Sequence, residues 1–315
     1  MSKGSDTPQS LYQRAFKRLI RRKLVVACFI TIFIYLFIAL LGALNILPDY
    51  QTRISSGYEV PSIWLTLCDL FGTLTAEEKS LMEATTAAST YLPKILGTDI
   101  FGRSVLYKLL AGTKTAMTIG FLVTSIAIPI GIVLGGVSGF FGGKVDAFVV
   151  WLYTVIISVP YILMVIAISY VLGKGMVAIC IAMGSLWWVT TCRLTRGEFL
   201  KHKDREYVLA SRLLGASDSR IIFRHILPNV LHLPIITGSL LVLGAIKAEV
   251  ILTFLGVGIQ DGASWGTMID DAKGELVQGI WWPLTGTVIA MFFIIYSLNV
   301  VGDALRDALD PKLLD

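Results

Sequence analysis

The chain has 315 residues, of which 55% are hydrophobic and 16% charged, and its mean hydropathy is +0.74. An average soluble domain carries about 25% charged residues, so this composition excludes an ordinary water-soluble enzyme or binding domain. The formal net charge of +5 would suit a nucleic-acid-binding protein, but the positions of the charges decide between such interpretations. The four cysteines show neither a disulfide framework nor a metal-binding spacing, and we expect no metal site and no bound cofactor.

The first segment, residues 1–23, is rich in basic residues. Within residues 11–23 the apolar side chains fall near one helical face, which is typical of an amphipathic helix that lies on membrane lipid. The positive-inside rule places this segment in the cytoplasm. The uncharged stretch that follows is too long for a cleaved signal peptide, so we expect the segment to be retained. The basic residues are Arg14, Lys17, Arg18, Arg21, Arg22 and Lys23.

Long apolar stretches then recur along the chain. A helix needs roughly 20 apolar residues to cross about 30 Å of hydrocarbon, and six stretches meet this length, one of them with two internal charges. The sequence therefore predicts an all-α membrane protein with six transmembrane helices, located in the inner (cytoplasmic) membrane as a multi-pass protein. Because six spans return the chain to its starting side, we expect both termini to be cytoplasmic. The expected spans are residues 24–47, 115–143, 147–173, 175–192, 234–259 and 276–302.

The segments between the spans differ in charge. Residues 48–114 are expected to form an extracytoplasmic loop, and residues 115–315 the membrane-embedded core, which includes the cytoplasmic segment 193–233. In the loop, Thr75 and Glu78 fit a capping box. Residues 60–71 are apolar enough to lie in the membrane interface or against another subunit, and a small local hydrophobic cluster is the equal alternative. Residues 193–224 carry eight basic against four acidic side chains, which assigns them to the cytoplasm.

The cytoplasmic segment 193–233 carries ordered turn signals. Residues 205–214 read as a helix that ends at Gly215, because glycine takes the left-handed cap conformation most easily. A second helix follows, with Ser217 or Asp218 as its cap and Pro228 as its expected end. A DNA-binding helix-turn-helix has a similar pattern. Since spans hold this unit against the bilayer at both ends, we expect no nucleic-acid partner.

Four ordered blocks of sequence resemble one family of transport proteins. The main block reads EYVLASRLLGASD and, a few residues later, RHILPN, and the other blocks are LGTD with GR, FLGVG with SWG, and GDALRDALDP. The first of these is similar to the EAA motif, the cytoplasmic loop of binding-protein-dependent ABC importer permeases. The whole set most resembles the second permease subunit of the dipeptide/oligopeptide group. The resemblance runs from residue 96 to the end of the chain.

The resemblance implies a type I ABC importer permease fold and a set of partners. These are a homologous second permease, two ATPase subunits that bind ATP, and an extracytoplasmic solute-binding protein. Peptides are the expected solute, and the same group also includes nickel and glutathione importers. The residues expected to couple this chain to the ATPases are Glu206, Ala210, Ser211, Arg212, Gly215, Ala216, Asp218, Arg224 and Pro228.

The sequence departs from the family pattern at three positions. Leu209 stands where the motif has glutamate and Ser211 where it has its second alanine, so an ion pair made through that glutamate is absent or moved to Glu206. Ser104 stands where aspartate is usual. The chain has no phosphate-binding loop of the form Gly-x4-Gly-Lys-Ser/Thr. We therefore expect a transporter subunit that is not itself an enzyme, with ATP hydrolysis in its partners.

Lys247 and Glu249 are the two charges inside the fifth span. A self-sufficient channel or secondary transporter would need ion-coupling residues of this kind, and that class remains the alternative. A membrane scaffold would leave the EAA-like loop without purpose. Residues two apart point in different directions on a helix, so we expect Glu249 to face the pathway or the paired permease and Lys247 to meet a carboxylate or helix-end carbonyls. Snorkelling toward the interface is the other possibility.

Overall fold

The regular secondary structure of the described part of the chain is helical. The computed structural model describes residues 19, 22–71, 73, 75, 78, 80, 92–260 and 262–309. Within these ranges two isolated β-bridges occur and no strand forms, so the prediction of an all-α protein is confirmed. The longer helices are α2 (Lys23–Ala43), α3 (Ser62–Leu70), α6 (Val105–Phe141), α7 (Gly143–Ile157), α8 (Tyr161–Leu172), α9 (Met176–His202), α13 (His232–Phe254), α14 (Trp265–Val277) and α15 (Trp282–Leu309).

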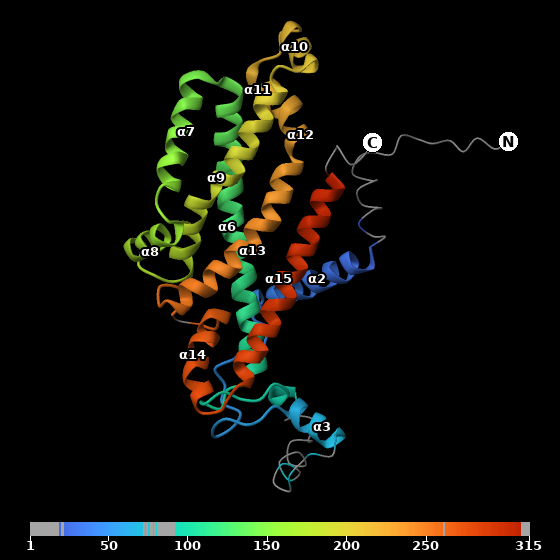
Figure 1. The fold of residues 1–315 in the computed structure, drawn as a ribbon, viewed down its shortest axis with the longest axis vertical. Helices are drawn as coiled ribbons and strands as arrows, with labels where there is room; N and C mark the ends of the chain where they lie inside the picture. Colours follow the sequence, from blue (N-terminus) through green and yellow to red (C-terminus); the bar gives the residue numbers. More distant parts are fainter. Residues whose placement is uncertain are drawn as a thin grey trace, which may run out of the picture.

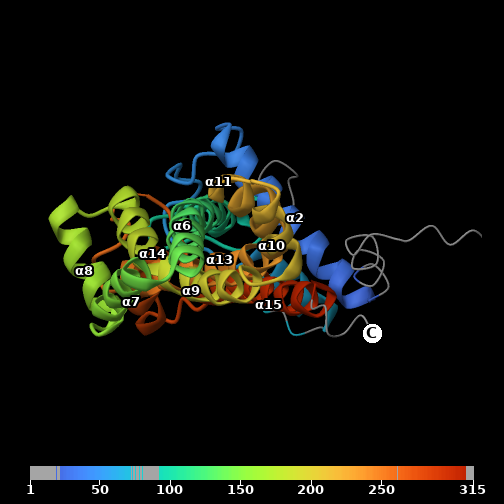
Figure 2. The same cartoon turned by 90° about the horizontal axis from the view of Figure 1, so that it is seen from above.

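The helices form an elongated bundle. Helices α6, α9, α13 and α15 run along its length, while α2 lies across the bundle against α6 and α15 (Figure 1). The view along the bundle shows α7 and α8 displaced to one side (Figure 2). A short helical unit around α10 caps one end of the molecule, and α14 and α3 lie at the other (Figure 1). These two ends are called the α10 end and the α14 end below.

The number of expected spans agrees with the structure, although their bounds differ. Five helices are long and apolar enough to cross a membrane, and α7 with α8 makes a sixth span if this bent pair is counted as one. The pair bends by 89°, so the expected single span 147–173 is broken. Pro160 directly precedes α8 with a non-helical ψ of 123°, and a proline disfavours the helical conformation of the residue before it, which explains the break.

Other bounds differ in both directions, since some helices extend beyond the charge-free gaps and others begin or end inside them. Helix α6 begins at Val105, inside the segment expected to be a loop, and α9 continues past the expected end of its span to His202. The expected last span 276–302 begins instead at Trp282, and α14 is a separate helix before it. Charged side chains at helix ends thus lie within continuous helices.

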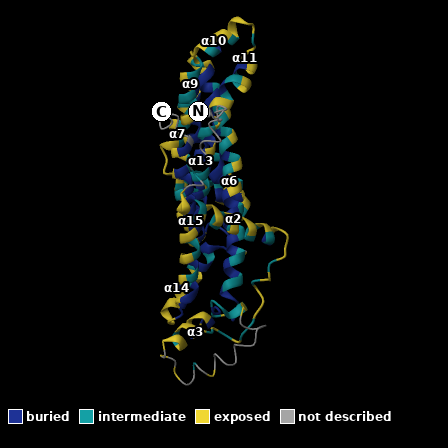
Figure 3. Ribbon diagram, turned by 90° about the vertical axis from the view of Figure 1, so that its right-hand side faces the viewer, coloured by how far each residue is buried: buried dark blue, intermediate teal, exposed yellow. Residues whose placement is uncertain are grey.

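Close packing of α6 on α9 forms the centre of the bundle. Gly131, Gly135 and Gly139 lie four residues apart on α6 and face the α9 backbone. A Cβ atom at Gly135 would lie 2.5 Å from the carbonyl oxygen of Cys192. Small residues at this spacing let two helices approach closely within a membrane. Buried residues accordingly follow the middle of the bundle (Figure 3).

The outer surface is apolar where the helices would meet lipid. Large hydrophobic side chains are exposed along α2, α7 and α15, which is the pattern of a protein whose exterior contacts hydrocarbon. Examples are Phe33, Phe37, Phe148, Trp151, Val288, Phe292 and Phe293.

Two smaller expectations concern the chain before α6. Thr75 and Glu78 form the expected reciprocal cap, because the Thr75 backbone nitrogen donates to the Glu78 carboxylate at 2.8 Å and the Glu78 nitrogen donates to the Thr75 hydroxyl at 3.4 Å. The amphipathic helix expected over residues 11–23 lies, apart from residues 19, 22 and 23, outside the described residues.

Candidate functional site

The segment that resembles the EAA loop forms a compact helical unit at the α10 end. Helix α10 spans Glu206–Leu213 and is followed by Gly215. The chain then forms α11 (Asp218–Arg220), the π-helix η1 (Ile221–Ile226) and α12 (Leu227–Val230). The predicted order of helix, glycine turn and helix is therefore confirmed. We call residues 206–230 the coupling unit.

Gly215 ends α10 in the left-handed conformation, with φ of +80°. The Gly215 nitrogen donates to the Arg212 carbonyl at 3.0 Å, and the Ala216 nitrogen donates to the Ser211 carbonyl at 3.1 Å. This second bond spans six residues and is typical of a helix end closed by glycine. Ser217, rather than Asp218, provides the cap of the next helix, since its hydroxyl accepts from the Arg220 nitrogen at 3.4 Å.

Pro228 does not end the second helix, and that expectation is wrong. Pro228 lies at the start of α12, and the chain returns to a helix at His232. The Leu227 nitrogen donates to the Ile222 carbonyl five residues earlier, in π-helical geometry. This wider turn leaves room for the proline ring, which would clash with the preceding turn of an ordinary α-helix.

One face of the coupling unit is buried against the ends of the long helices. Val208, Ile221 and Ile226 are fully buried in a hydrophobic cluster with Phe199 of α9 and Phe140 of α6. Tyr207 and His202 add a 2.7 Å contact between a phenol oxygen and a ring nitrogen. These contacts fix the unit to the bundle, so a force on the unit is passed to α6 and α9.

The other face of the coupling unit is apolar at its tip. Leu213 and Leu214 are 90% and 89% exposed, and both directly precede Gly215. Neither leucine is among the site residues predicted from the sequence. A helical pattern predicts that some leucines of α10 are buried, but the two at its end lie beyond the contact with α9.

Most residues expected to couple the chain to an ATPase lie on this outer face. Glu206 makes no ion pair among the described residues, so the structure does not show a replacement for the missing motif glutamate. Arg212 lies 3.9 Å from Asp218, and both side chains are more than half exposed. Ser211 and Ala216 are half-buried. The exposed members are Glu206, Ala210, Arg212, Gly215, Asp218, Arg224 and Pro228.

An ion pair that the sequence did not predict joins three helices near the coupling unit. Asp146 of α7 accepts from the Arg196 Nη2 atom of α9 at 2.6 Å, and from the hydroxyl of Ser138 in α6. The partners lie 50 and 8 residues apart along the chain. No local pattern links Asp146 to Arg196, so only the packing of α7 on the bundle reveals the pair.

The two charges inside α13 point in opposite directions, as expected. Lys247 is exposed on the outside of this chain, and no carboxylate within the described residues pairs with it. Glu249 is completely buried, and the Thr253 hydroxyl donates to its Oε1 atom at 2.9 Å. The expectation that Glu249 faces a pathway or a paired subunit is not met, because residues of this chain cover its carboxylate.

Thr253 connects Glu249 to the segment between α13 and α14. Its hydroxyl donates to Glu249 and also accepts from the Ile259 backbone nitrogen at 3.1 Å. The Oε2 atom of Glu249 has no hydrogen-bond partner among the described residues. The buried carboxylate therefore holds the turn after α13, which leads into a polar cavity.

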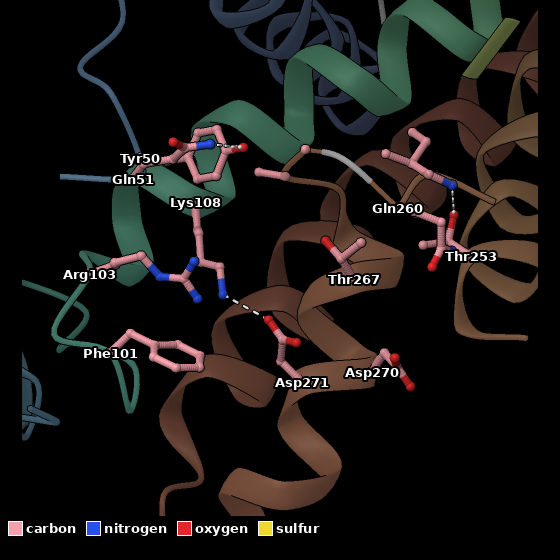
Figure 4. Close-up of a pocket in the computed structure, with 13 residues that line it drawn as sticks. Tyr50, Gln51, Phe101, Arg103, Lys108, Thr253, Gln260, Thr267, Asp270 and Asp271 are labelled. Atoms are coloured by element: carbon pink, nitrogen blue, oxygen red, sulfur yellow. Dashed lines mark hydrogen bonds and ion pairs between the residues drawn. The ribbon is translucent and has the colours of Figure 1, made fainter. Parts of the chain in front are cut away.

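A polar cavity of about 680 Å³ lies at the α14 end. Phe101, Arg103 and Lys108 line it from the start of α6 and the segment before it, and Asp270 and Asp271 from α14 (Figure 4). Within the described residues, no group of three or more His, Cys, Asp or Glu side chains is arranged to hold a metal ion. The cavity thus presents charges of both signs.

A cluster of ion pairs forms one wall of this cavity. Asp99 is 1% exposed and accepts from the Arg103 Nε atom at 2.8 Å and the Lys108 Nζ atom at 3.1 Å. Lys108 also donates to the Asp271 Oδ2 atom at 2.9 Å. Burial acts to raise the pKa of Asp99, but the Lys108 charge and the Arg103 contacts outweigh it and hold this pKa below its usual value.

This cluster explains the sequence block LGTD with GR. Asp99 also accepts from the backbone nitrogens of Phe101 and Arg103, both at 2.9 Å. One carboxylate therefore shapes the turn before α6 and also bonds both cations beside it. Nearby, burial raises the pKa of the Glu275 carboxyl, although the Lys108 charge opposes that shift.

Comparisons with known proteins match this chain to one family and to several relatives. Residues 127–315 match the family described as binding-protein-dependent transport system inner membrane component. The chain is 39% identical over 218 residues to the dipeptide transport system permease protein DppC of Bacillus subtilis, covering 69% of this chain and 68% of the relative. It is 41% identical over 221 residues to the oligopeptide transport system permease protein OppC of the same organism, covering 69% and 71%.

A third relative covers nearly the whole chain. The dipeptide transport system permease protein DppC of Alkalihalophilus pseudofirmus is 29% identical over 312 residues, covering 98% of this chain and 92% of the relative. Among solved structures, an inward-facing MetNI methionine ABC transporter matches at a TM-score of 0.47 and 17% identity, covering 64% of this chain and 94% of that chain. By its family match and its identity to these permeases, the chain belongs to the family of binding-protein-dependent transport system inner membrane components.

Proposed function

We propose that this chain is one of two permease subunits of an ATP-driven importer that moves di- and oligopeptides across the cytoplasmic membrane. Family membership supports the transport role, and the relatives named as dipeptide and oligopeptide permeases support peptides as the solute. The observation that carries the proposal is the coupling unit. It is rigidly attached to the bundle, and its apolar tip has no cover within the described chain.

The tip of the coupling unit has the chemistry of a docking site for a soluble partner. Burying a leucine side chain is worth roughly 1.5–3 kcal/mol relative to leaving it in water, and Leu213 and Leu214 offer this gain side by side. Arg212 and Arg224 lie on the exposed face of the same unit and can form charge-assisted bonds with acidic groups. Apolar anchors with a charged rim are typical of interfaces with a specific partner. We assign this partner as the ATPase subunit.

Attachment of the coupling unit explains how movement would reach the membrane. Closure of the ATPases would displace the unit, and the buried cluster around Phe199 would pass that displacement to α6 and α9. The Asp146–Arg196 pair holds α7 to the same helices. Helix α13 follows the unit directly and leads to the polar cavity at the opposite end.

The proposed orientation puts the α10 end in the cytoplasm and the α14 end outside. The basic residues of segment 193–224 support it through the positive-inside rule. The Arg22 Nη1 atom lies 3.3 Å from the Asp307 Oδ2 atom, so the start of α2 and the last turn of α15 are together. This contact supports two termini on the same side. A reporter inserted near Lys201 should read as cytoplasmic and one near Glu83 as external, and an external signal at Lys201 would refute the orientation.

The alternative of a self-sufficient channel or secondary transporter has less support. Its only intramembrane candidates were Lys247 and Glu249. Lys247 faces outward, Glu249 is covered, and neither lines the polar cavity. The two classes differ in a simple measurement. A permease subunit should co-purify with ATPase chains, whereas a self-sufficient transporter should move solute when reconstituted alone.

Solute-stimulated ATP hydrolysis tests the proposed function most fully. The complex would be reconstituted with its second permease, two ATPases and solute-binding protein, and then supplied with dipeptides, oligopeptides, glutathione or nickel. Peptides should stimulate ATP hydrolysis. If nickel or glutathione alone stimulated ATP hydrolysis, the proposed importer role would stand and the proposed solute would be wrong. No stimulation and no association with an ATPase would refute the proposal.

A further inference from the structure

One cation of the polar cavity lacks a full set of partners. The Arg103 Nε atom donates to Asp99, but no acceptor within the described residues bonds the two terminal Nη nitrogens. The guanidinium lies 4.7 Å from the centre of the Phe101 ring, and its side chain is 23% exposed. Figure 4 shows it directed into the cavity beside Lys108. Its planar pair of donors matches the two oxygens of a carboxylate.

A carboxylate of the same cluster offers the complementary charge. Asp271 uses its Oδ2 atom to accept from Lys108, and its Oδ1 atom has no partner among the described residues. Its side chain is 44% exposed, and it comes from α14, on the other side of Lys108 from Arg103 (Figure 4). A carboxylate in this position suits a cationic group such as an ammonium.

The charges and the size of the cavity together restrict the ligand. Among the described residues, its charged lining consists of two cations, Arg103 and Lys108, and two carboxylates, Asp270 and Asp271. A purely anionic or cationic solute would unbalance these charges, but a zwitterion would not. The volume of about 680 Å³ lies within the roughly 300–1,000 Å³ that is usual for small-molecule sites.

We propose that this cavity is a binding site for a short free peptide, with the peptide carboxylate on the Arg103 Nη nitrogens and the peptide ammonium on Asp271. The proposal rests on the proposed function, because it assumes that peptides reach the α14 end. In this proposal the permease subunit itself binds both charged termini of the peptide. A peptide blocked at either end would lose one of the two charge-assisted contacts.

The test is direct binding to the assembled complex without the solute-binding protein. The purified complex in lipid nanodiscs would be equilibrated with radiolabelled dialanine, and dialanine amide and N-acetyl-dialanine would compete for binding. Each charge-assisted contact is worth about 1.5 kcal/mol or more, which corresponds to about tenfold in affinity. We expect dialanine to bind the wild-type complex about tenfold more tightly than either blocked peptide.

Variants separate the two ends of the site. Arg103→Gln should abolish the preference over dialanine amide while keeping the preference over N-acetyl-dialanine. Asp271→Asn should do the reverse. Arg53→Gln is the matched control, since Arg53 donates to the Phe101 carbonyl at 2.8 Å but does not line the cavity. It should keep both preferences.

Several results would overturn this proposal. They are wild-type binding without a preference for free termini, absence of binding, and an unchanged preference in an assembled Arg103→Gln complex. If loss of the Asp99 contact prevents Arg103→Gln from assembling, the wild-type comparison and Asp271→Asn decide the question alone. A complex that still hydrolyses ATP in response to peptide while failing these tests would refute the cavity site and leave the proposed function standing.

Discussion

Replacement of Gly215 separates backbone geometry from side-chain contact at the coupling unit. Gly215 has φ of +80°, and a Cβ atom added there would meet no atom within 4 Å. A side chain at this position therefore finds open space and disturbs only the backbone conformation. Asparagine tolerates the left-handed region best, alanine less well, and β-branched valine least.

The size of the effect follows from that conformation. For a residue other than glycine, the left-handed backbone conformation is roughly 1–2 kcal/mol higher in free energy than the right-handed one. For valine the penalty is larger because valine is β-branched. A change of one or two kcal/mol alters a conformational equilibrium by a factor of about 5–30. The bonds from Gly215 to Arg212 and from Ala216 to Ser211 close a helix of only eight residues. The loss of stability should therefore be confined to the coupling unit.

The assay compares ATPase binding and membrane insertion in Gly215→Asn, Gly215→Ala and Gly215→Val. ATPase affinity should fall in that order, while the thermal unfolding of the bundle stays close to wild type. Gly197→Val is the control, because Gly197 also has open space but lies within α9 without a positive φ. Wild-type ATPase affinity and transport in Gly215→Val, or an equal loss in the control, would refute the reasoning.

Three further predictions concern the bundle. Gly135→Leu should lower Tm, because the added Cβ meets the α9 backbone at 2.5 Å and overpacking costs about 1–3 kcal/mol; an unchanged Tm would contradict the close helix contact. Asp99→Asn should lower the free energy of unfolding by about 3–5 kcal/mol, because it breaks a buried ion pair. Asp270→Asn affects a half-exposed pair and should lower it by less than about 1 kcal/mol. Equal losses in chemical denaturation of the two variants would contradict the stabilising role of the buried cluster. Glu249→Ala should lower Tm by removing the acceptor of a buried hydroxyl, while Lys247→Met should not; thermal melts of both variants decide this, and the reverse order would be inconsistent with the structure.

Patterns within single segments predicted much of the fold. Charge-free stretches located the six apolar regions because each transmembrane helix must exclude charge over its own length. The glycine turn was equally local, since Gly215 alone supplies the left-handed conformation. Helix bounds were less accurate, because α6 and α9 extend beyond the hydrocarbon region and carry charged residues at their ends.

Features that depend on packing could not be predicted from these patterns. The two prolines gave opposite errors. Pro160 precedes a bend of 89° in a segment that was predicted to be one continuous span. Pro228 was predicted to end a helix, but a π-helix accommodates it. Burial of Glu249 depends on what covers its face of α13. The pair of Lys108 and Asp271 joins positions 163 residues apart, and no short-range pattern records such a distance.

Site-specific photo-crosslinking tests the role of the coupling unit most directly. A benzophenone-bearing residue would replace Leu214 at the tip of the coupling unit or, as the control, Val277 at the α14 end, and both native side chains are 89% exposed. The variants would be expressed with the second permease and the ATPase subunits, and illuminated in the assembled complex. The account predicts an adduct with an ATPase subunit from position 214 and none from position 277. An ATPase adduct from position 277, or its absence from position 214 in a complex that hydrolyses ATP, would contradict it.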